Sequence, residues 1–126
     1  MNKKEVIATQ SAPAAIGPYS QGIAFDDLVF VSGQLPIDVK TGTMPESYAA
    51  QTEQSLKNVQ AILEEAGSSL DKALKVTVFL KDMSKFSEIN EVYAKFFNEN
   101  PPARCAVEVS ELPKGASVEI EAIAHK

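Results

Sequence analysis

The best candidates for chemistry lie in the last quarter of the chain. Arg104 follows a stiff Pro101-Pro102-Ala103 segment at the start of a predicted strand, which would hold its planar guanidinium in a fixed place. A fixed guanidinium suits a carboxylate, because its fork of N–H donors matches the two oxygens. The alternative is an ordinary arginine at a strand edge that pairs with Glu108, Glu119 or Glu121. The position alone leaves both interpretations open.

Glu119 and Glu121 lie two residues apart on a predicted strand, so their side chains share one face. Either could serve as a general acid or base if it were partly desolvated beside Arg104. Simple alternation of solvated carboxylates along a strand is the other explanation. The pair is therefore a candidate for proton transfer and not yet an assignment.

Further residues could line a small-molecule pocket. Tyr19 could present its hydroxyl to a pocket or plug an edge of the core. The Ser32-Gly33 pair ends a predicted strand, where a small residue lets a ligand approach backbone amides or simply forms a bulge. Asn90, on a predicted helix, either reaches a neighbouring group or is solvated. Cys105 has no plausible histidine partner, so we expect a packed thiol rather than a nucleophile.

The scarce residue types exclude much chemistry. The only histidine of this 126-residue chain is His125, so a Ser-His-Asp triad, a Cys-His dyad, a paired-histidine nuclease and an ordinary zinc site are not expected within one chain. The formal net charge is −5, and no Lys/Arg cluster is longer than Lys3-Lys4, which argues against binding along a nucleic-acid backbone. We expect no metal and no cofactor.

Length and composition indicate a single domain over residues 1–126. A chain of this size buries a core of its own, and 44% hydrophobic with 23% charged residues is ordinary for a globular protein. The mixed, charged N-terminus and the lack of a long apolar run predict neither a signal peptide nor a membrane span. The lone Cys105 fits a reducing compartment. We therefore expect a cytoplasmic protein.

The elements that must position these side chains follow an α+β order. Runs rich in β-branched and aromatic residues predict strands over residues 4–9, 22–25, 28–35, 73–80, 104–109 and 117–124. A helix opens at Pro45-Glu46 and closes at Gly67, with apolar residues at three- and four-residue spacing. A second amphipathic helix carries aromatic and apolar residues from Phe86 to Phe97 on one side, and Asn100-Pro101-Pro102 stops it. This pattern predicts helices packed on one face of a sheet.

Two periodic patterns predict which faces are buried. In the last strand, Glu119, Glu121 and Ile123 point away from the helices, while the alternate residues point toward them. This mixed face suits either water or a polar subunit interface. The aromatic stripe over residues 86–97 is expected in the core, because it lacks the interleaved cations of a nucleic-acid stacking platform.

Three segments together carry a family resemblance. They are APAAIGPYSQ at residues 12–21, VSGQLP at residues 31–36, and a stretch over residues 102–122 that runs from Pro-Ala-Arg through Leu-Pro to VEIEA. In this order they resemble the reactive intermediate deaminase family, also called the YjgF family, over about residues 7–124. The resemblance implies a chorismate-mutase-like α+β fold (bacillus type) with a mixed six-stranded sheet and two helices on one face. It also implies a homotrimeric barrel with sites between subunits.

The resemblance also assigns roles to individual residues. Arg104 matches the arginine that binds the substrate carboxylate, and Glu119 matches the glutamate that positions or activates water. The positions that match residues lining the cleft are Tyr19, Ser32, Gly33 and Asn90, and the backbone at Cys105 is expected beside the substrate. One departure is Cys105 itself, since many relatives have Ser there and Cys one position later, and this changes the pocket wall.

The implied activity is that of a 2-iminobutanoate/2-iminopropanoate deaminase. Such an enzyme hydrolyses small 2-imino or 2-enamino acids, such as 2-aminoacrylate, to 2-keto acids and ammonia without a cofactor. Arg104 would anchor the carboxylate, and Glu119 would orient a water beside it. Alternatives are an endoribonuclease or translation inhibitor, and a non-catalytic module that binds small keto or amino acids. The expected partners are small molecules and further copies of the chain, without membrane and without nucleic acid.

Overall fold

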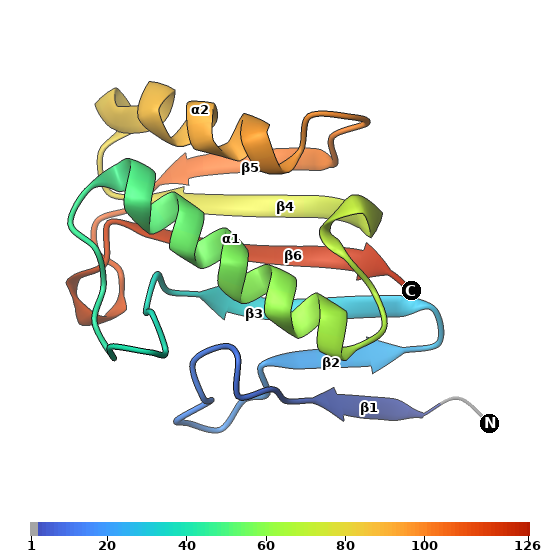
Figure 1. Cartoon of the computed structure of the whole chain (residues 1–126). Coiled ribbons are helices and arrows are strands. Elements are labelled where there is room, and N and C mark those ends of the chain that lie inside the picture. The colour runs from blue at the N-terminus through green and yellow to red at the C-terminus, as the bar shows by residue number, and fades with distance from the viewer. Residues whose placement is uncertain (1–2) are drawn as a thin grey trace.

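A six-stranded sheet with two helices on one face makes up the fold, in a computed structural model that describes residues 3–126 (Figure 1). The strands are β1 (Lys4–Ile7), β2 (Gly22–Phe25), β3 (Leu28–Gln34), β4 (Ala73–Leu80), β5 (Ala103–Glu108) and β6 (Val118–His125). The helices are α1 (Tyr48–Glu65) and α2 (Phe86–Phe96), with short 3-10 turns η1 (Leu70–Lys72), η2 (Met83–Lys85) and η3 (Pro113–Gly115). The predicted α+β class is confirmed.

The sheet is mixed, in the order β1-β2-β3-β6-β4-β5. The first three strands form an antiparallel meander, and β6 inserts antiparallel between β3 and β4. β4 and β5 are parallel, and the chain between them forms α2, as a parallel crossover requires. The last strand therefore lies near the centre of the sheet, where residues of β3 and β4 flank it.

The first helix begins later than predicted and ends where predicted. It begins at Tyr48 rather than at Pro45, because the Ser47 hydroxyl oxygen accepts the amide of Ala50 at 3.0 Å and caps the first turn. Gly67 follows the last turn with a φ of 83°, a left-handed conformation that glycine adopts without strain. The predicted closure at Gly67 is confirmed.

Strand boundaries differ from the predictions by at most two residues. β2 and β4 agree residue for residue, whereas β1 ends at Ile7 instead of residue 9. The cause is a change of partner, since the Thr9 amide donates to the side-chain oxygen of Gln21 at 2.7 Å and leaves the strand ladder. β3 ends at Gln34, and β5 and β6 are each displaced by one residue.

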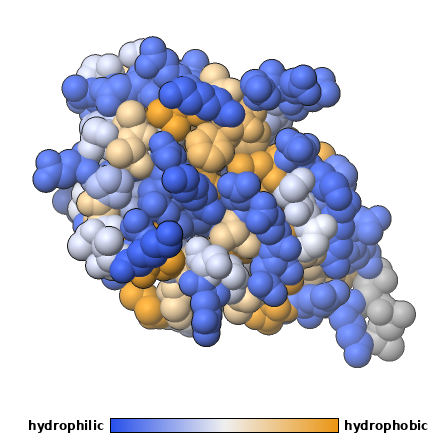
Figure 2. Space-filling view, viewed as in Figure 1, coloured by the Kyte–Doolittle hydropathy of each residue, from blue (hydrophilic) through white to orange (hydrophobic). Residues whose placement is uncertain are grey.

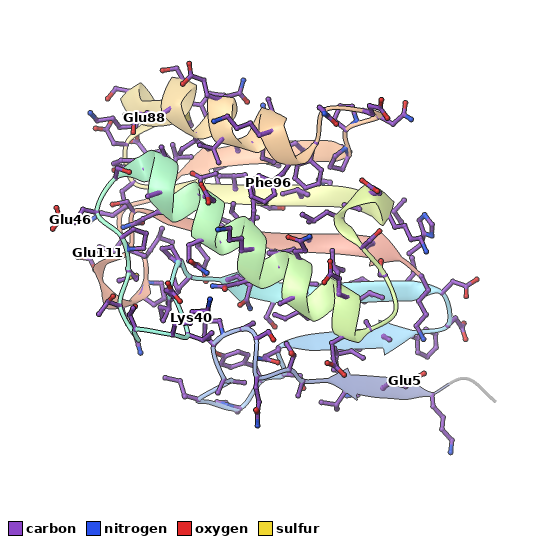
Figure 3. The ribbon with its side chains drawn as sticks, in the orientation of Figure 1. Glu5, Lys40, Glu46, Glu88, Phe96 and Glu111 are labelled. Atoms are coloured by element: carbon purple, nitrogen blue, oxygen red, sulfur yellow. The ribbon has the colours of Figure 1, made fainter. Side chains whose placement is uncertain are left out.

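The core lies between the sheet and the two helices. It is built from aliphatic side chains of α1 and of the central strands, among them Leu56, Ile62, Val76, Val78 and Ile120, which are almost fully buried. Burial of this kind contributes about 25 cal/mol per Å² of apolar surface. Phe96 lies between α2 and the sheet (Figure 3) and packs against the core, as the aromatic stripe predicts. Neither helix among the described residues is long and apolar enough to cross a membrane.

The opposite face of the sheet, called the outer face below, carries no helix within residues 3–126 (Figure 1). Its side chains include Phe30, which is 42% exposed, together with Val6 and Val107. The helix-bearing face, by contrast, presents mostly hydrophilic side chains in Figure 2. The largest apolar residues left to solvent thus gather on the outer face and not over the helices.

Candidate functional site

A cleft of about 810 Å³ lies on the outer face, at the end of β3 and the beginning of β6. Four of the predicted site residues line it: Tyr19, Ser32, Gly33 and Glu119. Glu121 and Lys114 add charge to its rim, and its apolar wall includes Ile16, Leu35 and Ile37. We call this hollow the Glu119 cleft. A mostly apolar hollow with a few convergent polar groups is typical of a small-molecule site.

The carboxyl group of Glu119 is half-buried in this cleft. Burial raises the pKa of Glu119 above its ordinary value of 4.5, and the carboxylate of Glu121 on the same face raises it further. The two side chains therefore share a face, as the strand pattern predicts. A more basic carboxylate in a partly dry site suits the acceptance and return of a proton.

Gly33 leaves the space that the Glu119 side chain occupies. A methyl group added at Gly33 would lie 2.7 Å from the Glu119 Oε2 atom, which is closer than real contacts allow. The register of β3 against β6 shifts between Val31 and Gln34, so Ser32 and Gly33 form a bulge beside the carboxylate. The residue type at position 33 thus sets where the carboxylate lies.

Ser32 holds the loop that carries Tyr19. Its hydroxyl donates to the Ser20 carbonyl at 2.6 Å, and its amide donates to the Gln21 carbonyl at 2.9 Å. Tyr19 itself is 52% exposed and lines the cleft, so it does not plug the core. The Ser32 hydroxyl proton is used inside the chain, which leaves only its oxygen lone pairs for a ligand.

Arg104 lies at a second place, on the edge strand β5 beside α2. Its Nη1 atom donates to the Asn90 Oδ1 atom at 2.7 Å. Its guanidinium carbon lies 4.7 Å from the ring centre of Tyr93 and 5.1 Å from that of Phe86, both within cation–π range. We call these three α2 side chains the Arg104 clamp. Asn90 therefore reaches a neighbouring group, and the aromatic stripe does more than fill the core.

No carboxylate of the described chain neutralises Arg104. The two ion pairs found within residues 3–126 join Lys57 to Glu53 and Lys126 to Glu5. The alternative in which Arg104 pairs with Glu108, Glu119 or Glu121 is not seen within the described part of one chain. An exposed guanidinium in a fixed orientation, without an anionic partner of its own, is available to an external anion.

The Glu119 cleft and Arg104 lie on opposite faces of the sheet. In the strand registers Arg104 pairs with the buried Val76 and emerges on the helix side, whereas Glu119 pairs with Phe79 and emerges on the outer face. β4 separates their strands and their partners on β4 are three residues apart, which places the two backbones roughly 14 Å apart. The expectation that Glu119 lies beside Arg104 does not hold within one chain.

Cys105 follows Arg104 on the same strand but faces the other side of the sheet, where its thiol is exposed rather than packed. The structure thus sorts the predicted site residues into two groups. Tyr19, Ser32, Gly33 and Glu119 form one, and Asn90 with Arg104 forms the other. Among residues 3–126 no group of three or more His, Cys, Asp or Glu side chains could hold a metal ion.

A family model matches nearly the whole chain. The model, described as Endoribonuclease L-PSP, matches residues 9–126. The chain belongs to this family. A RutC family protein of Pyrococcus horikoshii is 56% identical over 124 residues, which cover 98% of each chain. A 2-iminobutanoate/2-iminopropanoate deaminase of Salmonella typhimurium is 50% identical over 123 residues, covering 95% of this chain and 96% of its own.

The fold of this L-PSP family member also matches solved structures. The crystal structure of Escherichia coli TdcF with bound serine has a TM-score of 0.94 and 46% identity, and it covers 97% of this chain and 98% of its own. The resemblance to the reactive intermediate deaminase family is thereby confirmed, as is the mixed six-stranded sheet with two helices.

Gln21 is a structural residue of the Glu119 cleft that sequence reasoning missed. Its buried amide nitrogen donates to the carbonyls of Thr9, Ala12 and Pro13, at 3.1, 3.2 and 2.7 Å. These bonds gather the N-terminal loop into the curve that carries Tyr19. The signal was a polar residue directly before a strand that otherwise points apolar side chains inward.

A buried polar stripe on α1 is the second feature missed from the sequence. Gln51, Ser55 and Asn58 lie one turn or two turns apart on one face of α1, and each reaches a wall of the Glu119 cleft. The Gln51 Oε1 atom accepts the amide of Val118 at 3.1 Å, directly before Glu119. The other two donate to backbone carbonyls over residues 34–37. α1 therefore holds both sides of the cleft mouth in place.

Proposed function

We propose that this chain is a hydrolase that deaminates small 2-imino and 2-enamino acids to 2-keto acids and ammonia. The observation that carries the proposal is Arg104, whose guanidinium is oriented by Asn90 and two rings yet has no carboxylate partner among residues 3–126. Such a group is a receptor for the carboxylate of a substrate. The deaminase name of the Salmonella relative supports this substrate class, and serine, bound in the TdcF structure, also carries a carboxylate.

We further propose that one complete site needs two copies of the chain. The Glu119 cleft of one copy would face the Arg104 of the next, in a homotrimer, since a single chain keeps them on opposite faces. The exposed apolar side chains of the outer face support this arrangement, because a patch of that kind marks an interface. Head-to-tail contacts that close on themselves produce rings of this type.

The proposed reaction requires little from the protein beyond position and one proton carrier. Arg104 binds the carboxylate, which places the adjacent C=N carbon against a water held by Glu119. The water oxygen bonds to that carbon while Glu119 takes one water proton and passes it to the imine nitrogen, which gives a neutral carbinolamine and restores the carboxylate. Glu119 then takes the hydroxyl proton of the carbinolamine and delivers it to the amino nitrogen, the C–N bond breaks, and ammonia leaves as the C=O bond of the ketone forms. Fixed geometry supplies most of the acceleration.

The family description also names an endoribonuclease, and the site does not favour that chemistry. The only histidine, His125, lies exposed at the end of β6, away from the Glu119 cleft. The cleft carries two carboxylates, Glu119 and Glu121, which would repel a phosphate backbone. RNA cleavage by highly purified protein, lost on Arg104→Ala, would contradict the proposal.

A trapping assay tests the proposed activity directly. A pyridoxal-dependent serine or threonine dehydratase generates the imine, semicarbazide traps it, and the rate of trapping is followed with and without this protein. We expect the wild type to suppress trapping and both Arg104→Ala and Glu119→Gln to lose about 100-fold or more in kcat/KM. Arg104→Lys is the matched control, because it keeps the charge but lacks the planar fork. Unchanged trapping across several imines with the wild type would leave binding without turnover as the function.

A further inference from the structure

The residues that hold Arg104 form one stripe of α2. Phe86, Asn90 and Tyr93 are spaced four and three residues apart, so they lie on the same side of the helix. Arg104 emerges from β5 on that side of the sheet and lies over both rings while it donates to Asn90. Three contacts from one rigid element thus act on one guanidinium.

The chemistry of these three contacts leaves the charge of Arg104 intact. Two aromatic faces and a neutral amide oxygen attract a cation, but none of them carries the negative charge that would neutralise it. Within the described chain the guanidinium donates one side-chain hydrogen bond, which the amide oxygen of Asn90 accepts. Arginine has five N–H donors, so two parallel donors remain free for a carboxylate.

We infer that Phe86, Asn90 and Tyr93 are positioning residues that turn Arg104 into a receptor for planar carboxylates. The inference rests on the proposed function and deepens it, since it makes carboxylate recognition depend on α2 as well as on Arg104. It also gives Asn90 a different role from the expected lining of the cleft, because its amide oxygen accepts a hydrogen bond from Arg104. Carboxylate binding depends on the side chain at position 90 being uncharged, since a carboxylate there would itself pair with the guanidinium.

The rival explanation is that these side chains only pack the core. Tyr93 is 5% exposed and stacks on Phe97 with ring centres 4.7 Å apart, so it does contribute to the core. Its hydroxyl, however, is buried without a hydrogen-bond partner in the described chain, and burial raises its pKa although Arg104 lowers it. The ring face of Tyr93, and not its hydroxyl, therefore contacts Arg104. Phe86 is only partly buried, which makes it the cleaner position to test.

The sharpest test places a charge at position 90 without changing its shape. Calorimetric titration measures binding of 2-oxobutanoate and of its uncharged amide to the intact wild type and to Asn90→Asp. We expect the wild type to prefer the keto acid, and Asn90→Asp to bind it at least about tenfold more weakly because its own carboxylate pairs with Arg104. The melting temperature should stay the same or rise, which separates this loss from unfolding. Asn90→Ala should lose less affinity than Asn90→Asp.

Ring variants test the aromatic contacts in the same titration. Phe86→Leu should weaken keto-acid binding about threefold to tenfold, the range expected for one cation–π contact. Lys95→Arg, on the exposed side of α2, is the control, and its affinity should stay within about twofold of the wild type. In the trapping assay KM should rise for Phe86→Leu more than kcat falls.

Two outcomes would overturn the inference and they are distinguishable. If the wild type prefers the keto acid but Asn90→Asp and Phe86→Leu bind it equally well, the α2 contacts do not position Arg104, and the proposed function survives. If the wild type shows no preference for the keto acid over its amide, Arg104 is no carboxylate receptor. In that case the proposed function fails together with the inference.

Discussion

Glu119 is the residue whose environment most affects its chemistry. Its carboxyl group is half-buried on the outer face, two residues from a second carboxylate, and it fills the space above a glycine. In one chain no basic side chain pairs with it among residues 3–126. A carboxylate kept this way is costly to ionise, which supports the proton-transfer role proposed for it.

The cost of ionising Glu119 predicts a stability that depends on pH. Burial, and then Glu121, raises the folded pKa of Glu119, so the stabilising effect of its proton is full below the ordinary value of 4.5 and is lost as pH rises through the folded pKa. At pH 7 the charge therefore destabilises the fold, and Glu119→Gln should melt at a higher temperature. The comparison belongs in an Arg104→Ala background, where no second copy can offer a guanidinium.

Scanning calorimetry at pH 7 and at pH 4 measures this effect. The gain from Glu119→Gln should be present at pH 7 and should shrink at pH 4, where the wild-type group is protonated in both states. A variant that melts lower than its parent at pH 7 would show that the ionised carboxylate is stabilised by contacts that the structure does not contain.

Gly33→Ala should reduce activity through the position of Glu119. The added methyl would lie 2.7 Å from the Glu119 Oε2 atom, so the carboxylate has to move. A displacement of about 1 Å costs up to about 100-fold in rate, whereas the flexible end of one side chain costs little stability. We expect kcat/KM to fall with a nearly unchanged melting temperature. In a Glu119→Gln background the same methyl should add little, and an additive loss would mean that Gly33 acts on the substrate instead.

Among the elements, α1 does the most to shape the cleft. Its apolar side packs on the sheet as expected, but its polar stripe holds backbone on both sides of the cleft mouth. Figure 3 labels Glu46 and Glu111 at this end of the molecule, in the two loops that precede α1 and β6. The helix therefore acts as the support of a site to which it contributes no lining residue.

Asn58→Ala should loosen the cleft wall. The Asn58 Nδ2 atom donates to the carbonyls of Leu35 and Ile37, both at 3.0 Å, and the side chain is almost fully buried. Two partly buried carbonyl acceptors would lose their donor, which costs about 1–3 kcal/mol of unfolding free energy. Urea denaturation measures that loss, and KM should rise with it. Gln60→Ala, whose side chain donates only to Glu64 of the same helix, is the control and should change neither.

The bounds of some strands can be predicted from the sequence, but the strands with which they pair cannot. The β-branched run over residues 73–80 predicts β4 residue for residue, and the alternation of β6 predicts its buried face. Nothing local reveals that β6 inserts beside β4, because strand pairing depends on contacts far apart in the chain. For the same reason the face of Arg104 is not predictable, since it depends on a parallel register with β4.

The hydrogen-bond partner of Asn90 is likewise not predictable from the sequence. An asparagine within an apolar helical stripe indicates that something polar lies opposite, but the pattern does not say what. The partner, Arg104, comes from a strand that follows the helix, and the two rings beside it look like ordinary core residues until that strand is placed. A polar residue between two aromatic residues at helical spacing is the signal to look for.

For the whole molecule, the outer face is the apolar surface that a single chain leaves exposed to solvent. Phe30→Lys places a charge in its middle and should shift sedimentation toward smaller species while activity falls, because buried charges without partners are not tolerated in an interface. Gln60→Lys on the helix-bearing face is the matched control and should leave both unchanged. A Phe30→Lys protein with wild-type size and rate would show that this face stays in water.

Mixing two inactive variants tests most directly whether each site combines Glu119 of one copy with Arg104 of another, as we propose. Arg104→Ala and Glu119→Gln chains carrying different tags are co-expressed, and the mixed oligomers are assayed for imine hydrolysis. Random mixing pairs an intact Glu119 with an intact Arg104 in about one quarter of the shared sites, so about one quarter of wild-type activity should return. Mixed oligomers no more active than the separate variants would show that the two residues do not act together across copies.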